Sequence, residues 1–235
     1  MRGSSDVDIV AKLTSSYRAD LSGLSASEKQ RWQNQKTGVS YSWQEFRSDV
    51  VGTLEDRYGR GAIKEGNKAI EVNTSALPLN ADVLVCQQYR KYYSYPTGYY
   101  EGVVFWDTSG NQVVNYPKRH IGRGSSKESD TGGRFKETVR MFKRARNYLV
   151  KQSELNKDTV ASYFLENLLY NVPDGRYTYD KRDRFEKILS YLQVTDYSNW
   201  ECQNGVTDLF GSGDTKWSTQ HADNFVYKLT DLWQR

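Results

Sequence analysis

Residues 3–10 read Gly-Ser-Ser-Asp-Val-Asp-Ile-Val and place two carboxylates one residue apart beside an apolar segment. On a β-strand, side chains at positions i and i+2 leave the same face, with Cα atoms roughly 6.5–7 Å apart. Asp6 and Asp8 are therefore predicted to converge on one side of a strand that runs to about Leu13. Such a pattern is either a pair of solvated acids on an edge strand or, with a third carboxylate, a site for a hard cation such as Mg²⁺.

The third acid is Asp82, which stands near the start of the apolar run 81–87. If this strand lies next to the strand with Asp6 and Asp8, roughly 4.8 Å away, the three acids can hold two metal ions. Two ions roughly 3.5–4 Å apart activate an attacking hydroxyl and neutralise a leaving pyrophosphate. The expected cofactor is therefore a pair of Mg²⁺ ions, with Mn²⁺ as the alternative.

The composition limits the class of protein. The chain has 235 residues, with 33 Lys and Arg against 29 Asp and Glu, and its net charge of +4 suits nucleotide ligands without indicating nucleic acid. Two cysteines far apart and two histidines form neither a disulfide framework nor a zinc motif. The sequence shows no signal-peptide pattern and no apolar run of membrane-spanning length. We therefore expect a cytoplasmic protein without membrane contact.

The hydrophobic periodicity predicts an α+β fold with two lobes. In the first half, a helix begins behind Ser42, with Glu45 as its capping-box partner, among several short strands. A Gly- and Ser-rich charged loop at 122–133 marks the lobe boundary. The expected domains are a mixed β-sheet lobe with flanking helices at 1–125 and a helical lobe at 126–235. The helices expected after the loop lie at 134–151, 159–171, 182–193 and 218–233.

Five tyrosines gather between residues 92 and 100, close to Arg90. They indicate either a stacking surface for single-stranded nucleic acid or, as we favour, the packing of a strand and its turn around Pro96 and Gly98. His120 has no chemistry that the sequence assigns, and a structural hydrogen bond is expected for it.

Five segments follow one another in the order seen in a known family: R-G-S-S-D-V-D-I-V, A-D-V-L-V, N-Y-P-K-R-H, F-K-E-T-V-R-M-F-K and S-Y-F-L-E-N-L-L-Y-N-V-P. On these segments the chain resembles the bacterial CD-NTases, relatives of cyclic GMP–AMP synthase and oligoadenylate synthetase among the DNA polymerase β-like nucleotidyltransferases. The resemblance covers nearly the whole chain. It implies a bilobed, metal-dependent enzyme that joins nucleoside triphosphates into cyclic or linear oligonucleotides, typically as an antiphage signal.

The resemblance also implies that Asp6, Asp8 and Asp82 are the catalytic, metal-binding acids. In the family, a Gly-Ser element at the opening of a helix binds the donor phosphates and lies well before the first of these acids. Here Gly3-Ser4 directly adjoins the acids. The chain is therefore expected to be truncated, beginning after the first helix and the first Gly-Ser turn, with impaired binding of the donor phosphates.

Three residues of the second lobe receive roles through the resemblance alone. Lys143 resembles the lysine that holds a triphosphate, Ser162 the serine that contacts the same phosphates, and Tyr163 the aromatic residue that stacks on a base. Lys143 continues a cationic helix face with Lys136 and Arg140, which taken by itself is equally a solvated surface. Likewise, Tyr163 taken alone is a core aromatic, and the Ser162 hydroxyl simply faces water.

Three functions follow from these patterns. The first is a synthase of oligonucleotide second messengers, and the second uses the same acids to transfer a nucleotide to a protein, a tRNA or a small molecule. The third is an inactive truncated module that binds nucleotides or a partner. The expected partners are nucleoside triphosphates, either ATP and GTP or the pyrimidine nucleotides, and the sequence is compatible with a regulatory protein partner. It indicates no double-stranded DNA partner.

Overall fold

The computed structural model describes residues 6–38, 40–212 and 216–235. The chain divides into two compact units, Met1–Tyr116 and Pro117–Arg235, which we call the sheet unit and the helical unit. This division lies nine residues before the boundary at 125 that the sequence suggests. The Gly3-Ser4 pair that was expected to adjoin the acids lies outside the described residues.

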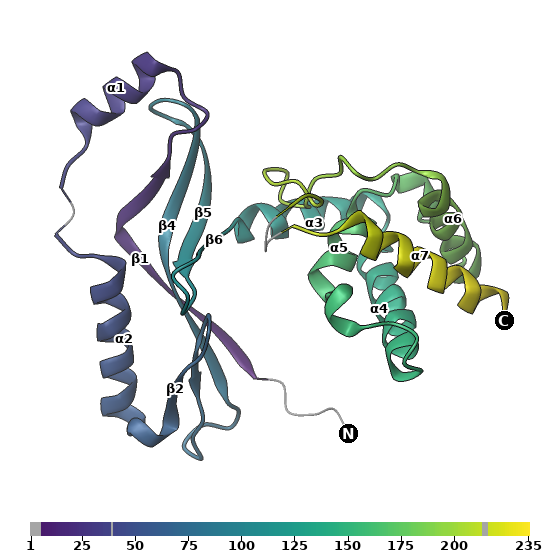
Figure 1. Cartoon of the computed structure of the whole chain (residues 1–235), viewed down its shortest axis with the longest axis horizontal. Helices are drawn as coiled ribbons and strands as arrows, with labels where there is room; N and C mark the ends of the chain where they lie inside the picture. The colour runs from purple at the N-terminus through teal and green to yellow at the C-terminus, as the bar shows by residue number, and fades with distance from the viewer. Residues whose placement is uncertain (1–5, 39, 213–215) are drawn as a thin grey trace. The chain divides into compact units, whose positions relative to one another are not determined.

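Two long strands, β1 (Val7–Asp20) and β4 (Ala81–Ser94), pair in parallel (Figure 1). Among the described strands β1 pairs with β4 alone and so lies at an edge of the sheet. β1 continues past Leu13, where the sequence suggested that it ends, because a register shift between Leu13 and Tyr17 lets its polar half go on pairing with β4. The remaining strands of the described residues are antiparallel to their neighbours and give the order β2-β3-β4-β5-β6. They are β2 (Ile63–Glu65), β3 (Ile70–Val72), β5 (Gly98–Trp106) and β6 (Gln112–Asn115).

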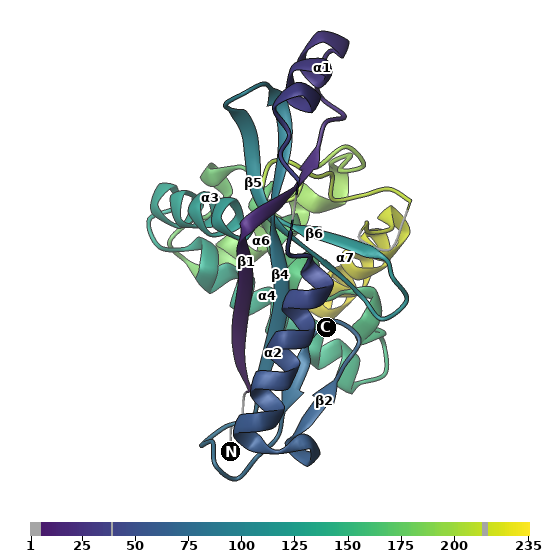
Figure 2. The same cartoon turned by 90° about the vertical axis from the view of Figure 1, so that its left-hand side faces the viewer.

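Two helices accompany this sheet, α1 (Ala26–Gln35) and α2 (Trp43–Tyr58), and α2 lies along one face of it (Figure 2). The predicted capping box of Ser42 with Glu45 is confirmed, and Gly59, with a φ of 84°, ends the helix. The short 3₁₀-helix η1 (Arg60–Ala62) leads into β2. Apolar side chains of α2 pack on the buried residues of the covered sheet face, which are Ile70, Val72, Ala81, Val83 and Val85.

The tyrosine cluster belongs to the hairpin of β4 and β5. Tyr92 is only 2% exposed, and its ring centroid lies 5.3 Å from that of Tyr99 on the partner strand. The Arg90 guanidinium lies 4.0 Å from the ring centroid of Tyr17 and 4.8 Å from that of Tyr99. Tyr92 and Tyr99 therefore pack a strand and its turn, as favoured, whereas Tyr93 is 56% exposed.

The helical unit consists of α3 (Pro117–Asp130), α4 (Phe135–Lys151), α5 (Ser162–Tyr170), α6 (Lys181–Val194) and α7 (Thr219–Gln234), with the 3₁₀-helices η2 (Lys157–Thr159) and η3 (Asp174–Arg176). The four helices predicted after residue 133 are confirmed to within three residues at each end. Their apolar faces form one core, in which Phe142, Phe164 and Phe225 are fully buried. None of the helices among the described residues has the length and apolar character needed to cross a membrane.

The predicted loop at 122–133 is wrong over most of its length, because residues 117–130 are helical. Gly124 is buried, and a Cβ atom there would clash with the side-chain nitrogen of Gln203. This glycine thus permits close packing inside a helix, whereas the sequence pattern suggested a flexible linker. The turn itself is short and rests on Gly132 and Gly133, whose φ angles are 58° and 80°.

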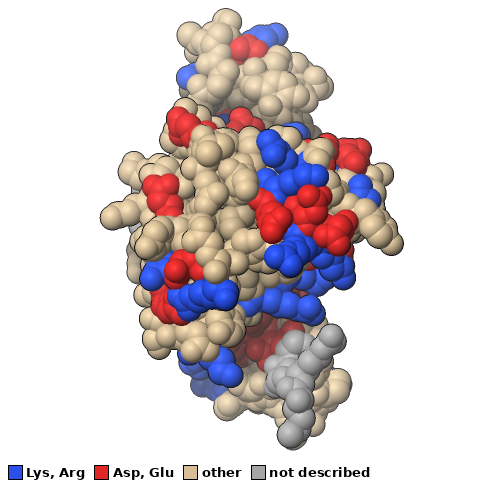
Figure 3. Space-filling view, turned by 90° about the vertical axis from the view of Figure 1, so that its right-hand side faces the viewer, with Lys and Arg blue, Asp and Glu red and all other residues tan. Residues whose placement is uncertain are grey.

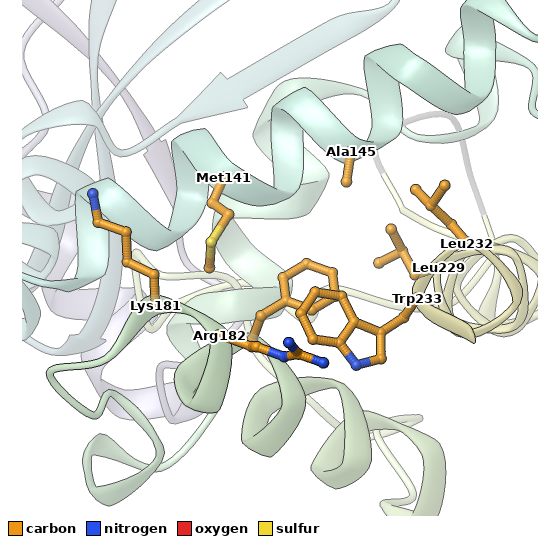
Figure 4. A pocket seen from close by; sticks show the side chains of 8 residues that line it. Met141, Ala145, Lys181, Arg182, Leu229, Leu232 and Trp233 are labelled. Carbon is orange, nitrogen blue, oxygen red and sulfur yellow. The ribbon is translucent and has the colours of Figure 1, made fainter. Parts of the chain in front are cut away.

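An apolar cavity of about 620 Å³ opens in the helical unit and is lined by residues of α4, α6 and α7 (Figure 4). The ring of Phe185 stacks on Trp233 at a centroid distance of 4.7 Å, and the Arg182 guanidinium lies 5.7 Å from the same indole. Neither Lys143 nor Tyr163 lines this cavity. Its lining residues are Met141, Ala145, Lys181, Arg182, Phe185, Leu229, Leu232 and Trp233.

Candidate active site

The two strands that carry the predicted acids lie side by side. In the parallel ladder of β1 and β4, Asp8 stands directly opposite Asp82. Opposed residues on neighbouring strands project to the same face of a sheet, and successive residues alternate between faces. Ala11, opposite Val85, packs in the core beneath α2. Asp8 and Asp82 therefore share the face that α2 does not cover.

The position of Asp6 beside this pair stays a prediction. Asp6 lies one residue before β1, where no ladder bond fixes its direction, although the next residue, Val7, donates its N–H to the carbonyl of Asn80 at 2.9 Å. Across residues 6–38, 40–212 and 216–235, no group of three His, Cys, Asp and Glu side chains is placed to hold a metal ion.

The pair formed by Asp8 and Asp82 nevertheless fits a divalent cation. Both donors are carboxylate oxygens, which hard cations such as Mg²⁺ prefer, and they come from adjacent strands at one register position. The Asp8 side chain is exposed and that of Asp82 is half-buried. Because Asp8 is open to solvent, an ion at this pair can keep several of its water ligands, as Mg²⁺ usually does.

β3 adds an acid that the sequence analysis did not single out. Glu71 stands opposite Asp82 on the other edge of β4, so its side chain projects to the same face. Lys64 on β2 stands opposite Glu71 in turn, and its ammonium lies 3.0 Å from the Glu71 carboxylate. A row of Asp8, Asp82, Glu71 and Lys64 thus crosses the sheet. The signal was present in the sequence, because Glu71 alternates with two buried residues of β3.

In the helical unit, α4 and α5 bring the three family-derived residues together. The Lys143 ammonium on α4 lies 3.8 Å from the carboxylate of Glu166 on α5. One turn further along α4, Arg146 donates to the hydroxyl of Ser162 at 3.3 Å. Ser162 and Tyr163 are the first two residues of α5, and the N-cap residue Ala161 has no side-chain oxygen that could bind the N–H groups of this turn.

Arg146 orients the Ser162 hydroxyl. Its side chain is almost fully buried, burial lowers its pKa, and within the described part of the chain no carboxylate lies within ion-pairing distance of it. Its hydrogen-bond acceptors are Asn147 Oδ1, the carbonyl of Val160 and Ser162 Oγ. Since the guanidinium uses the hydroxyl oxygen as acceptor, the hydroxyl proton of Ser162 is free to be donated to an anion.

Tyr163 keeps part of its ring open to solvent, with 45% of the residue exposed. Its hydroxyl interacts with Cys202 and Asn204, and burial raises its pKa to about 12. His120 stacks on the ring at a centroid distance of 5.2 Å and an interplanar angle of 25°. The same imidazole lies within hydrogen-bonding distance of Glu166, so the structural hydrogen bond expected for His120 is confirmed.

The chain is similar to known proteins over nearly its whole length. Residues 122–234 match the family model of the cGAS/DncV-like nucleotidyltransferase C-terminal helical domain. Over 99% of its length the chain is 42% identical to the cyclic UMP-AMP synthase of Rhodothermus marinus (strain SG0.5JP17-172), of which it covers 80%. The chain belongs to the cGAS/DncV-like nucleotidyltransferases, the CD-NTases.

Two further comparisons place the protein within the CD-NTases. It is 35% identical over 98% of its length to the cyclic nucleotide synthase CdnE01 of Staphylococcus haemolyticus, of which it covers 79%. Its structure superimposes on that of the Rhodothermus marinus CdnE c-UMP-AMP synthase with Apcpp and Upnpp with a TM-score of 0.89. That match has 41% identity and covers 99% of this chain and 78% of the other.

Membership of the CD-NTases makes the protein a nucleotidyltransferase and bears out the α+β fold with a helical second lobe. Nucleotidyltransferases of this family are generally metal-dependent, which agrees with a carboxylate pair on an open sheet face. On the face shown in Figure 3, Lys and Arg side chains lie among Asp and Glu side chains.

Proposed function

We propose that this protein is a metal-dependent synthase that joins nucleoside triphosphates into cyclic or linear oligonucleotide second messengers in antiphage defence. The observation that carries the proposal is the direct opposition of Asp8 and Asp82 in a parallel ladder, on the sheet face that α2 leaves open. The name of the Rhodothermus marinus relative makes ATP and UTP the first substrates to test. The two cysteines are free thiols, which fits a reducing cytoplasm.

Asp8 and Asp82, together with Asp6, are the residues that we propose hold the metal ions, two Mg²⁺ or in their place Mn²⁺. When bound, these ions activate the attacking hydroxyl of one nucleotide and neutralise the pyrophosphate that leaves the other. The protein contributes two like charges at one register position of a rigid sheet. A bound cation removes the repulsion between the two carboxylates, and the pair therefore favours cation binding at this position.

The helical unit is proposed to hold a nucleotide. The Lys143 ammonium, the Ser162 hydroxyl and the first N–H groups of α5 form a site for phosphate oxygens, and the helix dipole adds positive potential at the same end. Arg146 supports this site by orienting the hydroxyl. Tyr163 offers its exposed ring to the base.

The proposal is tested by incubating the purified protein with each pair of labelled nucleoside triphosphates and Mg²⁺, then treating the products with phosphatase. A phosphatase-resistant product that disappears in D8N and in D82N is expected. The matched control is D56N, which removes an exposed acid of α2 and should leave the product unchanged. Only unreacted nucleotides, under conditions where Mg²⁺ and the nucleotides bind, would count against the proposed reaction.

The same experiment separates nucleotide transfer to another acceptor. Label that appears on added tRNA or protein, with no small phosphatase-resistant product, would replace oligonucleotide synthesis by that second reaction. Both reactions need the same acids, so loss of label in D82N confirms only that the metal-binding pair is used.

A further inference from the structure

His120 lies between the two proposed nucleotide contacts of the helical unit. Its ring stacks on Tyr163, and its Nε2 lies 3.3 Å from one oxygen of Glu166, whose other oxygen lies 3.8 Å from the Lys143 ammonium. We propose that His120 is a positioning residue that sets the base-stacking ring of Tyr163 and the phosphate-binding ammonium of Lys143 at the same time. This inference rests on the proposed function of the helical unit.

The contact with Tyr163 fixes the plane of the tyrosine ring. At a centroid distance of 5.2 Å and an angle of 25°, the imidazole packs on one side of the ring, and side-chain hydrogen bonds of the Tyr163 hydroxyl with Asn167 and Asn204 hold its far end. Without this contact a partly exposed aromatic side chain would rotate, and a base that stacks on it would first have to order the ring. With His120 in place, the Tyr163 ring is already oriented for stacking before a nucleotide binds.

The contact of His120 with Glu166 keeps the Lys143 ammonium available to a phosphate. Glu166 accepts a hydrogen bond from His120, which lowers the carboxyl pKa and keeps the group ionised. An ionised carboxylate is only an acceptor, so Nε2 of His120 carries the hydrogen. Because this bond turns one oxygen toward His120, Lys143 is held at 3.8 Å by the other and keeps its donors available to a phosphate. Without His120, the carboxylate is free to close on Lys143 and to compete with phosphate for it.

Neighbouring residues hold His120 itself in place. The carbonyl of His120 accepts a hydrogen bond from the side chain of Gln203 at 2.7 Å, and the backbone N–H of Gln203 donates to Asn167 at 2.6 Å. The second ring nitrogen, Nδ1, is buried and has no hydrogen-bond partner among the described residues. A buried nitrogen without a hydrogen-bond partner lowers the stability of the fold. If His120 had a purely structural role, a side chain that lacks this nitrogen would therefore serve better.

The test measures the binding of two probes, Upnpp and inorganic tripolyphosphate, by calorimetry. His120→Gln keeps a donor for Glu166 and loses the ring, so Upnpp affinity should fall by about 3- to 10-fold while tripolyphosphate affinity stays within about 2-fold. His120→Phe keeps the stack and loses the donor, so the affinity for both probes should fall by the same factor. The matched control is H221N, which changes the chain's other histidine, an exposed residue of α7, and should alter neither affinity.

The wild-type protein supplies an independent readout that requires no variant to fold. Since the chain has two histidines, their ring signals in an NMR spectrum are simple to assign with H221N. Saturation with Upnpp should shift the ring signals of His120 and leave those of His221 unchanged. Unshifted His120 signals at saturation, or two variants that bind both probes as the wild type does, would overturn the inference and leave the proposed function standing. A wild-type protein that binds neither probe would overturn both.

Discussion

Replacing Asp82 with Asn should stabilise the metal-free protein and abolish its stabilisation by Mg²⁺. Opposed residues of neighbouring strands are roughly 4.8 Å apart, and two unit charges at that distance repel by about 0.9 kcal/mol in water and about 3.5 kcal/mol at an effective dielectric constant of 20. Asp8 is exposed, which places the repulsion near the lower value. Removing it should raise the midpoint of thermal unfolding by about 2–4 °C, from a gain of about 1 kcal/mol.

The assay is thermal unfolding of the wild type and of D82N, each with excess EDTA and with Mg²⁺. At a Mg²⁺ concentration ten times its dissociation constant, the wild type should gain about 1.4 kcal/mol, because the ion binds only the folded state. D82N should start from a higher midpoint and gain little. Glu71→Gln is a graded control, since it removes a neighbouring like charge that Lys64 already balances, and should give a smaller rise.

Two results would refute this reasoning. A lower midpoint of D82N in EDTA would mean that the carboxylate stabilises the metal-free fold through a favourable contact. A gain with Mg²⁺ that D82N keeps in full would mean that the ion binds away from the register pair. Either outcome would remove the physical basis for assigning the metal to Asp8 and Asp82.

Three further predictions concern stability. Phe185→Ala removes a ring that stacks between two others at 4.6 and 4.7 Å, and should cost about 3–5 kcal/mol in urea unfolding; a loss below 1 kcal/mol would contradict the packing. Hydrogen bonds from Ser25 and from the Tyr95 N–H lower the pKa of Glu28 to about 2. The ionised carboxylate therefore stabilises the folded state above pH 4.5, and this stabilisation is lost as the pH falls toward 2. The protection of the Tyr95 amide relative to its intrinsic exchange rate should therefore fall across that window in the wild type and show no such step in Glu28→Gln. Gly124→Ala should lower the melting temperature despite the better helix propensity of alanine, because its Cβ displaces Gln203; an unchanged or higher value would contradict this.

The sequence predicts those parts of the fold whose causes are local. The Ser42 cap, the apolar period of α2 and the four later helices depend on residues at most a few turns apart, and the structure contains them. The adjacency of β1 and β4 was a condition of the predicted metal site, and the structure fulfils it. The register that sets Asp8 opposite Asp82 could not be predicted from the sequence and is seen only in the structure.

The remaining differences arise from contacts that are distant in sequence. The sequence pattern places Gly124 in a loop. In the structure it is a helix residue, and glycine is needed there because the Gln203 side chain fills the space beside it. The polar second half of β1 lacks a clear apolar alternation, and its strand conformation follows from pairing with Gln88–Lys91 of β4. His120 and Tyr163 lie on different helices, and no local pattern indicates that their rings stack. The roles of the acids and of Lys143, Ser162 and Tyr163 stay predictions until the variants above are measured.

The parallel pairing of β1 with β4 also affects how the protein is made. Val7 pairs with Ala81, 74 residues later, so the first strand leaves the ribosome well before its partner is synthesised. At roughly 5–20 residues per second, this delay lasts roughly 4–15 s. During that time the open edge of β1, with Val7, Ile9 and Val10 along it, can join any other unpaired strand. Newly made chains should therefore aggregate most readily before β4 emerges, and a chaperone that binds nascent strands should raise the yield of folded protein.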